Sequence, residues 1–297
     1  MNTLPDHADQ PFQIDQLWVY PVKSCAGVRL PRATLLDTGL EWDRTWMVVD
    51  AQGEFVSQRE LPRMALIQPS FKLGQLVLRA PGMLALHLQL DAAEAPTRVR
   101  VWDDEVAAYD MGDVAAQWFS DFLSPGAPAS LQRLRLARFD PEVQRLSSLK
   151  WTGGVPASVF FGDGFAVLVA SAAALDDLNA RLAAAGQPAV DMRRFRPNIV
   201  LGGVAAHDED RFSDLYLPGA DTVHLQLVKP CARCPIPDVN PDTAATGHAV
   251  ADALQAYRAD ARVNGAITFG MNAVVRAGAE SVLAEGQTGM AAWGVWG

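Results

Sequence analysis

Short runs in which apolar and polar residues alternate dominate the N-terminal third of the chain. Residues 14–20 form an apolar run rich in aromatic and branched side chains, and Pro21 stops it, which is typical of a β-strand. The leucines at positions 84, 86, 88 and 90 would all lie on one face of another strand. Glycines recur between such runs, where turns are expected. The pattern predicts a barrel or sandwich of β-strands in this part of the chain.

Helical spacing of the apolar residues appears farther along, so the C-terminal half is predicted to mix helices and strands. Asp113 is the expected N-cap of a helix that runs to about residue 123, and Ser171 is the expected N-cap of a second helix that ends at Gly186. Residues 160–169 have the pattern of a hairpin with a Gly-Asp-Gly turn at 162–164. Further strands are expected at 199–201, 223–228, 267–269 and 272–276, with a short helix near 249–258.

These elements predict an α+β fold in which β-structure predominates. We expect a flexible lead-in over residues 1–12 and a β-rich N-terminal domain over residues 13–105. A helix and a polar connector follow over residues 106–150, and a second, mixed domain over residues 151–290. The length of 297 residues agrees with about two domains.

The composition excludes several classes of protein. Twenty-five basic and 34 acidic side chains give a net charge of −9, which argues against nucleic-acid binding through overall charge. No apolar run reaches the roughly 18 residues of a membrane span, and the polar, acidic first residues do not resemble a signal peptide. Three cysteines are too few for a disulfide scaffold. We therefore expect a globular, cytoplasmic protein.

The segment 229–243 carries the densest cluster of chemically active residues. It contains Cys231 and Cys234 in a C-x-x-C spacing, with Arg233 between them and Lys229 just before. A zinc site would use both cysteines, but a second pair of soft ligands is missing. A thioredoxin-like dithiol belongs in a βαβ unit, whereas a proline follows the second cysteine directly. The other interpretations are one thiolate that binds a soft metal or a cofactor, favoured by the neighbouring cations, and two inert cysteines.

Three other segments bring cations that could bind an anion. Lys23 and Ser24 follow the first strand, Arg44 lies between two tryptophans, and Arg196 and Asn198 precede a later strand. Guanidinium groups suit phosphate because they donate two parallel hydrogen bonds. Each segment alone also fits a solvated turn or an arginine packed on aromatic rings.

Acid–base and nucleotide-dependent chemistry have little support in the sequence. The acidic runs 103–105 and 208–210 fit solvated turns better than catalytic carboxylates. The chain has no G-x-S-x-G nucleophile elbow and no G-x-G-x-x-G dinucleotide fingerprint.

Several motifs occur in a fixed order from about residue 14 onward. They are Tyr-Pro-Val-Lys-Ser-Cys at 20–25, Asp-Arg-x-Trp at 43–46, Leu-x-Asp-Leu-Asn at 175–179, Phe-Arg-Pro-Asn-Ile-Val at 195–200, Cys-x-Arg-Cys at 231–234, Val-x-Pro-Asp-Thr at 239–243 and Phe-Gly at 269–270. In this order they resemble the MOSC family, named after the C-terminal domain of molybdenum cofactor sulfurase. The nearest subfamily is that of the amidoxime-reducing components and their bacterial relatives.

The resemblance implies a fold and a set of site residues. The fold would be an N-terminal β-barrel-like domain packed on a MOSC β-barrel domain with a few helices, and a molybdopterin cofactor would lie between them. Cys234 would bind molybdenum as the catalytic ligand. The cofactor-binding residues would be Lys23, Ser24, Arg44, Asp163, Gly164, Arg196, Asn198, Arg233 and Asn272.

The resemblance also implies an activity, the reduction of small N-hydroxylated compounds by two-electron oxygen-atom transfer. Electrons would come from a separate flavin reductase or a ferredoxin-type donor, because no cysteine follows Cys234 and the chain would carry no iron–sulfur cluster of its own. Asn240 stands where the family often has an aspartate, with Asp238 nearby. The alternative function is that of a persulfide carrier or a protein that delivers the cofactor.

Overall fold

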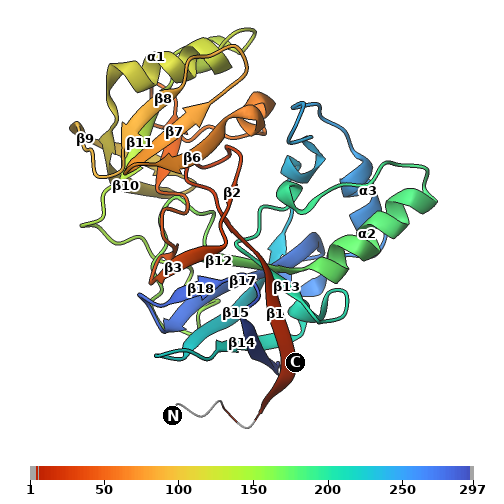
Figure 1. Ribbon diagram of the computed structural model, residues 1–297. Coiled ribbons are helices and arrows are strands. Elements are labelled where there is room, and N and C mark those ends of the chain that lie inside the picture. Colours follow the sequence, from red (N-terminus) through yellow and green to blue (C-terminus); the bar gives the residue numbers. More distant parts are fainter. Residues whose placement is uncertain (1–4, 6, 295–297) are drawn as a thin grey trace.

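In the residues that the computed structural model describes, Pro5 and 7–294, seven β-strands form a closed barrel (Figure 1). Around the barrel they follow in the order β12 (Val167–Ser171), β13 (Ile199–Gly202), β1 (Ala8–Val19), β19 (Thr288–Trp293), β14 (Phe212–Leu217), β15 (Val223–Ala232) and β17 (Ala266–Ala277). Strand β12 pairs in parallel with β13 and antiparallel with β17, so the sheet closes on itself.

The first strand of the chain is part of this barrel. Strand β1 pairs with β13 on one side and with β19 on the other. Its side chains Phe12, Ile14, Leu17 and Val19 are buried in the barrel core, where they pack with residues such as Leu225. Burying one such side chain contributes about 1.5–3 kcal/mol. The strand is therefore held by contacts with the C-terminal half of the chain.

This placement corrects two sequence expectations. Residues 8–12 belong to β1 rather than to a flexible lead-in, while residues 1–4 and 6 of that lead-in lie outside the described residues. Residues 13–19 belong to the barrel, although the sequence pattern assigned them to the N-terminal domain. Local periodicity identifies a strand but not its partners, and here the partners lie far away in the sequence.

Shorter elements and two of the helices attach to the barrel. Strand β2 (Val28–Arg29) pairs with β1, and β16 (Ala259–Asp260) pairs with β17. A small sheet contains β18 (Val282–Ala284), β3 (Arg32–Leu36) and β4 (Gly39–Leu40). Helices α2 (Ala172–Ala184) and α3 (Ala249–Gln255) lie side by side against the barrel (Figure 1). Their apolar faces share a core that includes Leu178 and Leu254.

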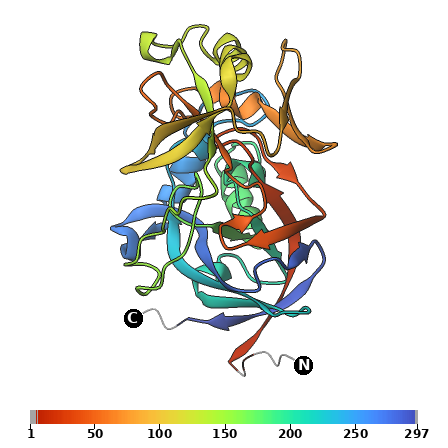
Figure 2. The same cartoon turned by 90° about the vertical axis from the view of Figure 1, so that its left-hand side faces the viewer.

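A second, smaller β-rich part is stacked on the barrel (Figure 2). One of its antiparallel sheets has the order β5 (Trp46–Val49), β11 (Arg135–Phe139), β10 (Asp104–Asp110) and β9 (Ala95–Val101). The other has the order β6 (Gln68–Lys72), β7 (Gln75–Arg79) and β8 (Leu86–Gln89). Helix α1 (Gly112–Leu123) contributes Trp118, Phe119 and Phe122 to the core beneath them. The predicted α+β fold with predominant β-structure is confirmed.

The helix predictions are confirmed, with one change at a helix start. Ser171 caps α2, since its Oγ accepts a hydrogen bond from the backbone N of Ala174 at 3.2 Å. Helix α1 begins two residues earlier than expected, with Met111 at the N-cap, and Asp113 lies in its first turn without capping it.

Two strand predictions are corrected by the structure. Residues 160–166 form a loop rather than the first arm of a hairpin, because β12 pairs with β13 and β17 instead of with the residues that precede it. The two strands expected at 267–269 and 272–276 are one strand, β17. It continues through Gly270, whose φ of +78° is a conformation that glycine adopts without strain.

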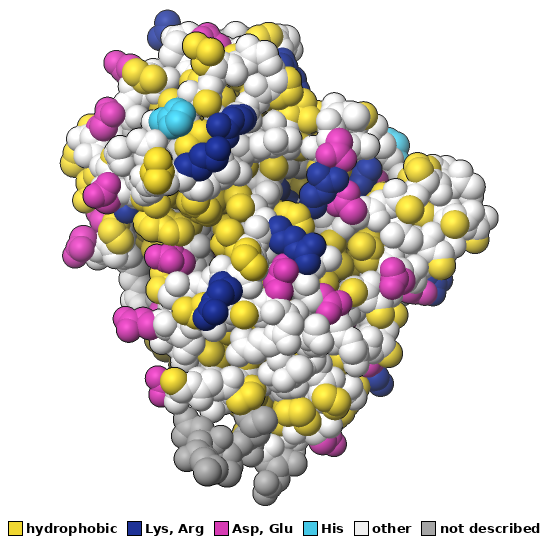
Figure 3. All heavy atoms as spheres, viewed as in Figure 1, with side chains coloured by type: hydrophobic (Ala, Val, Ile, Leu, Met, Phe, Trp, Pro, Cys, Tyr) yellow, Lys and Arg dark blue, Asp and Glu magenta, His cyan; other side chains and the backbone are white. Residues whose placement is uncertain are grey.

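Charges of both signs are distributed over the face of the molecule shown in Figure 3. Several lysine and arginine side chains on this face lie beside acidic ones, and no large area of this face is purely basic. Among the described helices, none has the length and apolar character needed to cross a membrane.

The acidic run 208–210 is buried, which corrects the expectation of a solvated turn. It forms a 3-10 turn that packs against β12 and β17, and Glu209 is fully buried. Glu209 Oε1 accepts a hydrogen bond from the backbone N of Ser171 at 3.0 Å, while its Oε2 has no partner among the described residues. Asp210 forms an ion pair with Arg258. The run is therefore a structural element between the barrel and its helices.

Glu209 makes the stability of the fold depend on pH. Burial, followed by the charge of Asp210, raises the pKa of Glu209 to about 7. Between an unfolded-state pKa of about 4.5 and about pH 7, the folded chain keeps a proton that the unfolded chain releases. The free energy of unfolding should therefore fall by about 3 kcal/mol as the pH rises through this window. Glutamine at position 209 cannot titrate, so the free energy of unfolding of Glu209→Gln should not show this decrease between about pH 4.5 and about pH 7.

Urea unfolding at about pH 5 and about pH 7.5 measures the effect. Glu142→Gln, at an exposed carboxylate, serves as the control and should behave like the wild type. An equal pH dependence in Glu209→Gln and the wild type would show that Glu209 is not held neutral in the folded state.

Candidate functional site

A cavity of about 670 Å³ lies where the smaller part of the structure meets the barrel. Its walls come from segments far apart in the sequence, including the residues after β1, the β9–β10 turn, the loop before β12 and the end of β15. Each of the ten residues that the sequence singled out lines this cavity: Lys23, Ser24, Arg44, Asp163, Gly164, Arg196, Asn198, Arg233, Cys234 and Asn272. The structure thus brings the whole predicted set together.

Lys23 and Ser24 reach the cavity because the chain turns sharply after β1. Ser24 adopts a left-handed conformation with a φ of +66°, and the backbone N of Lys23 donates to Trp46 O at 2.8 Å. Lys23 Nζ donates to Phe161 O at 2.9 Å and to Asp163 Oδ1 at 2.5 Å. Burial lowers the pKa of Lys23, and the nearby Asp163 partly offsets this effect. The ammonium is thus tied to the loop on the far side of the junction.

Arg44 and Arg196 lie together beside the ring of Tyr20. Their guanidinium carbons are 4.4 Å and 4.3 Å from the centre of that ring. Arg44 donates to Asp43 at 2.5 Å and to the backbone O of Arg196 at 3.1 Å. Arg196 Nη1 donates to Cys25 O at 2.6 Å, but its buried Nη2 has no partner among the described residues. Burial and the charge of Arg44 lower the pKa of Arg196 to about 10.

Asn198 is a buried residue that joins three segments. Its Oδ1 accepts hydrogen bonds from the backbone N of Leu168 at 3.0 Å and from Arg44 at 3.3 Å. Its Nδ2 donates to Trp18 O at 3.2 Å. The side chain therefore connects β1, β12 and the Arg44 turn at the cavity wall.

The loop that carries Asp163 and Gly164 is held by a buried arginine that the sequence analysis missed. Arg145 Nη1 donates to Phe160 O at 2.7 Å and to Gly162 O at 2.6 Å, and its Nε donates to Asp104 at 2.7 Å. These bonds explain why residues 160–166 are a loop, since two of their carbonyl groups are used by a side chain. A single arginine in a polar connector gives no signal in the sequence.

Asp163 faces the cavity next to two cations. Burial alone would raise the pKa of Asp163, but the charges of Lys23 and Arg44 outweigh it and hold the pKa well below its ordinary value. Trp102 Nε1 lies 3.3 Å from Asp163 Oδ1, and Trp102 occupies the β9–β10 turn with a φ of +56°. Trp102, with the segment that holds Phe55 and Arg59, is a further part of the wall that the sequence analysis did not identify.

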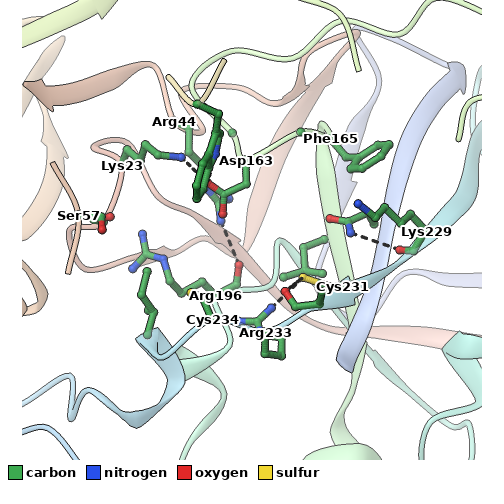
Figure 4. A pocket seen from close by; sticks show the side chains of 18 of the residues that line it. Lys23, Arg44, Ser57, Asp163, Phe165, Arg196, Lys229, Cys231, Arg233 and Cys234 are labelled. Carbon is green, nitrogen blue, oxygen red and sulfur yellow. Dashed lines mark hydrogen bonds and ion pairs between the residues drawn. The ribbon is translucent and has the colours of Figure 1, made fainter. Parts of the chain in front are cut away.

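The two cysteines of the C-x-x-C motif differ in their surroundings. Cys234 is exposed at the cavity wall and Cys231 is partly exposed (Figure 4). Arg233 Nη1 donates to Cys231 Sγ at 2.9 Å and its Nη2 donates to Phe195 O at 2.8 Å, while its buried Nε has no partner among the described residues. The thiol of Cys234 is thus the free sulfur of the motif that opens into the cavity.

The surroundings of the cysteines limit the chemistry of the motif. Among the described residues, no group of three or more histidine, cysteine, aspartate or glutamate side chains is placed to hold a metal ion. A zinc site with the usual ligand set therefore has no support within that part of the chain. Cys25 is buried, and burial raises the pKa of its thiol to about 12. A single thiolate at Cys234 remains compatible with the geometry.

Asn272 closes the remaining side of the cavity. It lies on β17 opposite Lys229 of β15, and its Nδ2 donates to Lys229 O at 3.3 Å. Figure 4 shows Lys229 and Phe165 on the side of the pocket opposite Lys23 and Arg196. The cavity therefore has one wall rich in buried guanidinium groups and another with an ammonium beside aromatic rings.

Two family models match the chain one after the other. The MOSC N-terminal beta barrel domain matches residues 11–125, and the MOSC domain matches residues 156–288. The matches cover more than half of the chain, and they agree with the family that the sequence motifs indicate.

Curated proteins give the same result. Mitochondrial amidoxime reducing component 2 of Bos taurus is 33% identical over 238 residues, which are 77% of this chain and 67% of that protein. Mitochondrial amidoxime-reducing component 1 of Homo sapiens has the same identity and the same coverage. Molybdenum cofactor sulfurase of Homo sapiens is 27% identical over 274 residues, which are 88% of this chain but 30% of that protein.

The chain thus spans about two thirds of the length of the amidoxime-reducing relatives, and the similarity extends over most of its own length. Its motifs, its closed barrel and the two consecutive domain matches agree. This chain is a member of the MOSC family, with a MOSC N-terminal domain followed by a MOSC domain.

Proposed function

We propose that this chain binds a molybdenum–pterin cofactor in the cavity and reduces N-hydroxylated compounds with electrons from a separate protein. The observation that carries the proposal is the exposed Cys234 thiol, which shares the cavity with Arg196 and Arg233. Each of these arginines has one buried guanidinium nitrogen without a partner among the described residues. A thiolate suits a soft metal, and guanidinium donors suit a phosphate. The similarity to proteins named amidoxime-reducing components supports the class of reaction.

The cavity walls fit an anionic cofactor. A buried hydrogen-bond donor without a partner costs about 1–3 kcal/mol, and Arg196 Nη2 and Arg233 Nε are two such donors. A bound anion that accepts their hydrogen bonds would remove this cost. We assign the pterin and its phosphate to Lys23, Ser24, Arg44 and Arg196, further cofactor contacts to Asp163, Gly164, Arg233 and Asn272, and the metal to Cys234. Asn198 contributes by holding Arg44, since protein groups already use its side-chain oxygen.

The cofactor, when bound, would supply a metal that changes its oxidation state by two electrons and accepts an oxygen atom. The chain binds and orients the reactants. Reduction of an N–OH group to N–H also consumes two protons and releases water, so the cavity has to provide protons.

Electrons would come from a separate flavin reductase or a ferredoxin-type protein. The chain has three cysteines, and Cys25 is buried away from the other two in the core of the smaller part. This number falls short of the thiolate set of an iron–sulfur cluster. We therefore assign no such cluster to this chain.

A second candidate function is transport of sulfur as a persulfide, or delivery of the cofactor to another protein. The similarity to molybdenum cofactor sulfurase and the exposure of Cys234 favour it. The buried cations of the cavity favour the first function, because a persulfide carrier has no use for several guanidinium groups around one thiol.

Substitution of the two cysteines tests the proposed function. Serine has nearly the size of cysteine but is a harder ligand with a much higher pKa. Cys234→Ser should lower the reduction of an amidoxime by reduced viologen at least about 100-fold and change the electronic spectrum of the metal. Cys231→Ser should keep the metal and most of the activity, because the Cys231 sulfur accepts a hydrogen bond from Arg233 and is not the proposed metal ligand. Circular dichroism at matched concentration checks the folding of both variants.

Equal loss of activity in both cysteine variants would reject a single thiolate ligand and favour a dithiol. The persulfide carrier would be favoured if the wild type contains sulfane sulfur but no metal, and if the sulfane sulfur is absent from Cys234→Ser.

The guanidinium of Arg196 should be needed for the cofactor and not for the fold. Arg196→Ala removes the unpartnered Nη2, and loss of one charge-assisted hydrogen bond corresponds to about 10- to 150-fold weaker cofactor binding. Arg193→Ala is the matched control, because Arg193 lies in the same loop but pairs with Asp191 and Asp242 outside the cavity. Molybdenum and pterin content per chain is the measurement. Equal cofactor content in the two variants would refute the assignment of Arg196.

A further inference from the structure

Lys229 presents an unpaired charge to the cavity. It lies on β15 two residues before Cys231, and its side chain is half-buried. In the part of the chain that the structure describes, no ion pair and no hydrogen bond of the Lys229 ammonium is present. Its charge is therefore left to solvent or to a ligand, since lysine normally keeps its charge in water or pairs it.

The other cations of the cavity differ from Lys229 because each already has an acceptor in the protein. Lys23 pairs with Asp163, Arg44 with Asp43, and Arg145 with Asp104. Arg59 donates to Ser57 Oγ, Arg196 to Cys25 O, and Arg233 to Cys231 Sγ. Among the described residues that line the cavity, Lys229 is thus the cation whose side chain donates to no protein acceptor.

Two aromatic rings flank the ammonium of Lys229. Its Nζ is 5.3 Å from the centre of the Trp151 ring and 5.9 Å from the centre of the Phe165 ring. Each ring attracts a cation, but neither accepts its charge as a carboxylate would. An anion that binds Lys229 would therefore have aromatic surface beside it for an apolar or planar body.

The segment that holds Trp151 is fixed to the barrel. The backbone N of Trp151 donates to Ser148 O at 3.0 Å, and Arg276 of β17 donates to Thr152 O at 2.7 Å. Thr152 itself is buried. The Trp151 ring is therefore held in place beside the Lys229 ammonium, although it is not among the residues that line the cavity.

The position of Lys229 separates it from the groups assigned to the cofactor phosphate. Figure 4 shows it across the pocket from Lys23 and Arg196. Lys229 and Cys231 lie two residues apart on β15 and both line the cavity, so they approach it from the same wall. A ligand held by Lys229 thus extends along the wall that leads to Cys234.

We propose that Lys229 determines substrate specificity by binding a carboxylate of the substrate, while Phe165, which lines the cavity beside it, contacts the aromatic body of the substrate. The inference deepens the proposed function and rests on it: the preferred substrates are aromatic N-hydroxylated compounds that carry a carboxylate at the end remote from the N–OH group. The carboxylate accepts a charge-assisted hydrogen bond from Nζ, which places the N–OH group toward Cys234.

A pair of substrates that differ in one charge tests this inference. The holoprotein is assayed with benzamidoxime and with 4-carboxybenzamidoxime, using reduced viologen as the reductant. Lys229→Met should lower the ratio of kcat/KM for the carboxylated over the neutral substrate about 10- to 150-fold, the value of one charge-assisted hydrogen bond. Lys229→Arg should keep most of the ratio. Lys150→Met is the matched control: Lys150 also lies near Trp151, at 5.6 Å, but is exposed and outside the cavity, and its ratio should equal that of the wild type.

Calorimetric binding of 4-carboxybenzamide, the carboxylated amide, to the holoprotein gives a second measurement that needs no turnover. Weaker binding in Lys229→Met than in Lys150→Met supports the carboxylate site. If neither substrate is reduced, the proposed reaction is overturned, but this binding result still supports the carboxylate site. An unchanged substrate ratio in Lys229→Met overturns the inference. A loss of molybdenum or pterin phosphate in Lys229→Met also overturns it, since Lys229 would then hold the cofactor.

Discussion

The candidate site depends on the hydrogen bonds of the Asn198 side-chain amide. The amide is buried. Its oxygen accepts hydrogen bonds from the backbone N of Leu168 in β12 and from Arg44, and its nitrogen donates to the backbone O of Trp18 in β1. Its backbone joins the same strands, since its N donates to Leu168 O and its O accepts from the backbone N of Trp18. These bonds tie the Arg44 turn to the barrel, together with the hydrogen bond that Arg44 donates to the backbone O of Arg196. The smaller part and the barrel therefore meet at a defined distance, and the cavity lies at that junction.

The second constraint is electrostatic, because the junction gathers more buried positive charge than the protein itself neutralises. Asp43 and Asp163 compensate Arg44 and Lys23. Arg196 has no such carboxylate, and burial together with the charge of Arg44 lowers its pKa to about 10. A site built in this way is stabilised by an anionic ligand, since the ligand supplies both the missing charge and the missing acceptors. The fold thus tolerates the free-energy cost of uncompensated positive charge at the junction, and binding of an anionic ligand would remove this cost.

Much of the fold and of the site could be predicted from the sequence. The apolar spacing identified the helices and most strands, since a strand or helix with one buried face imposes its period on the sequence. The motifs contain seven of the ten cavity residues. Asp163, Gly164 and Asn272 lie outside these motifs and followed only from the family resemblance. A short motif also shows which residue types a site contains, as the Cys-x-Arg-Cys motif does at the end of β15.

The remaining features depend on contacts that no local pattern records. Strand β1 pairs with strands from the C-terminal half, so its place in the barrel follows from the closure of the sheet and not from its own sequence. The run 208–210 fits a solvated turn by its sequence because charged residues are usually exposed, yet it is buried and Asp210 pairs with Arg258. Arg145 gives no signal in the sequence, and only the structure shows that it holds the loop at 160–162. The sequence shows only that Lys229 is close to the two cysteines of the motif. The tertiary structure shows that its ammonium faces the cavity beside Trp151.

The central claim is that the cavity between the two domains holds one molybdenum–pterin cofactor. The most direct test is elemental and pterin analysis of the wild-type chain purified from a host that synthesises the cofactor. The account predicts molybdenum and pterin in a ratio near one per chain. Chains that carry sulfane sulfur but neither molybdenum nor pterin would contradict it.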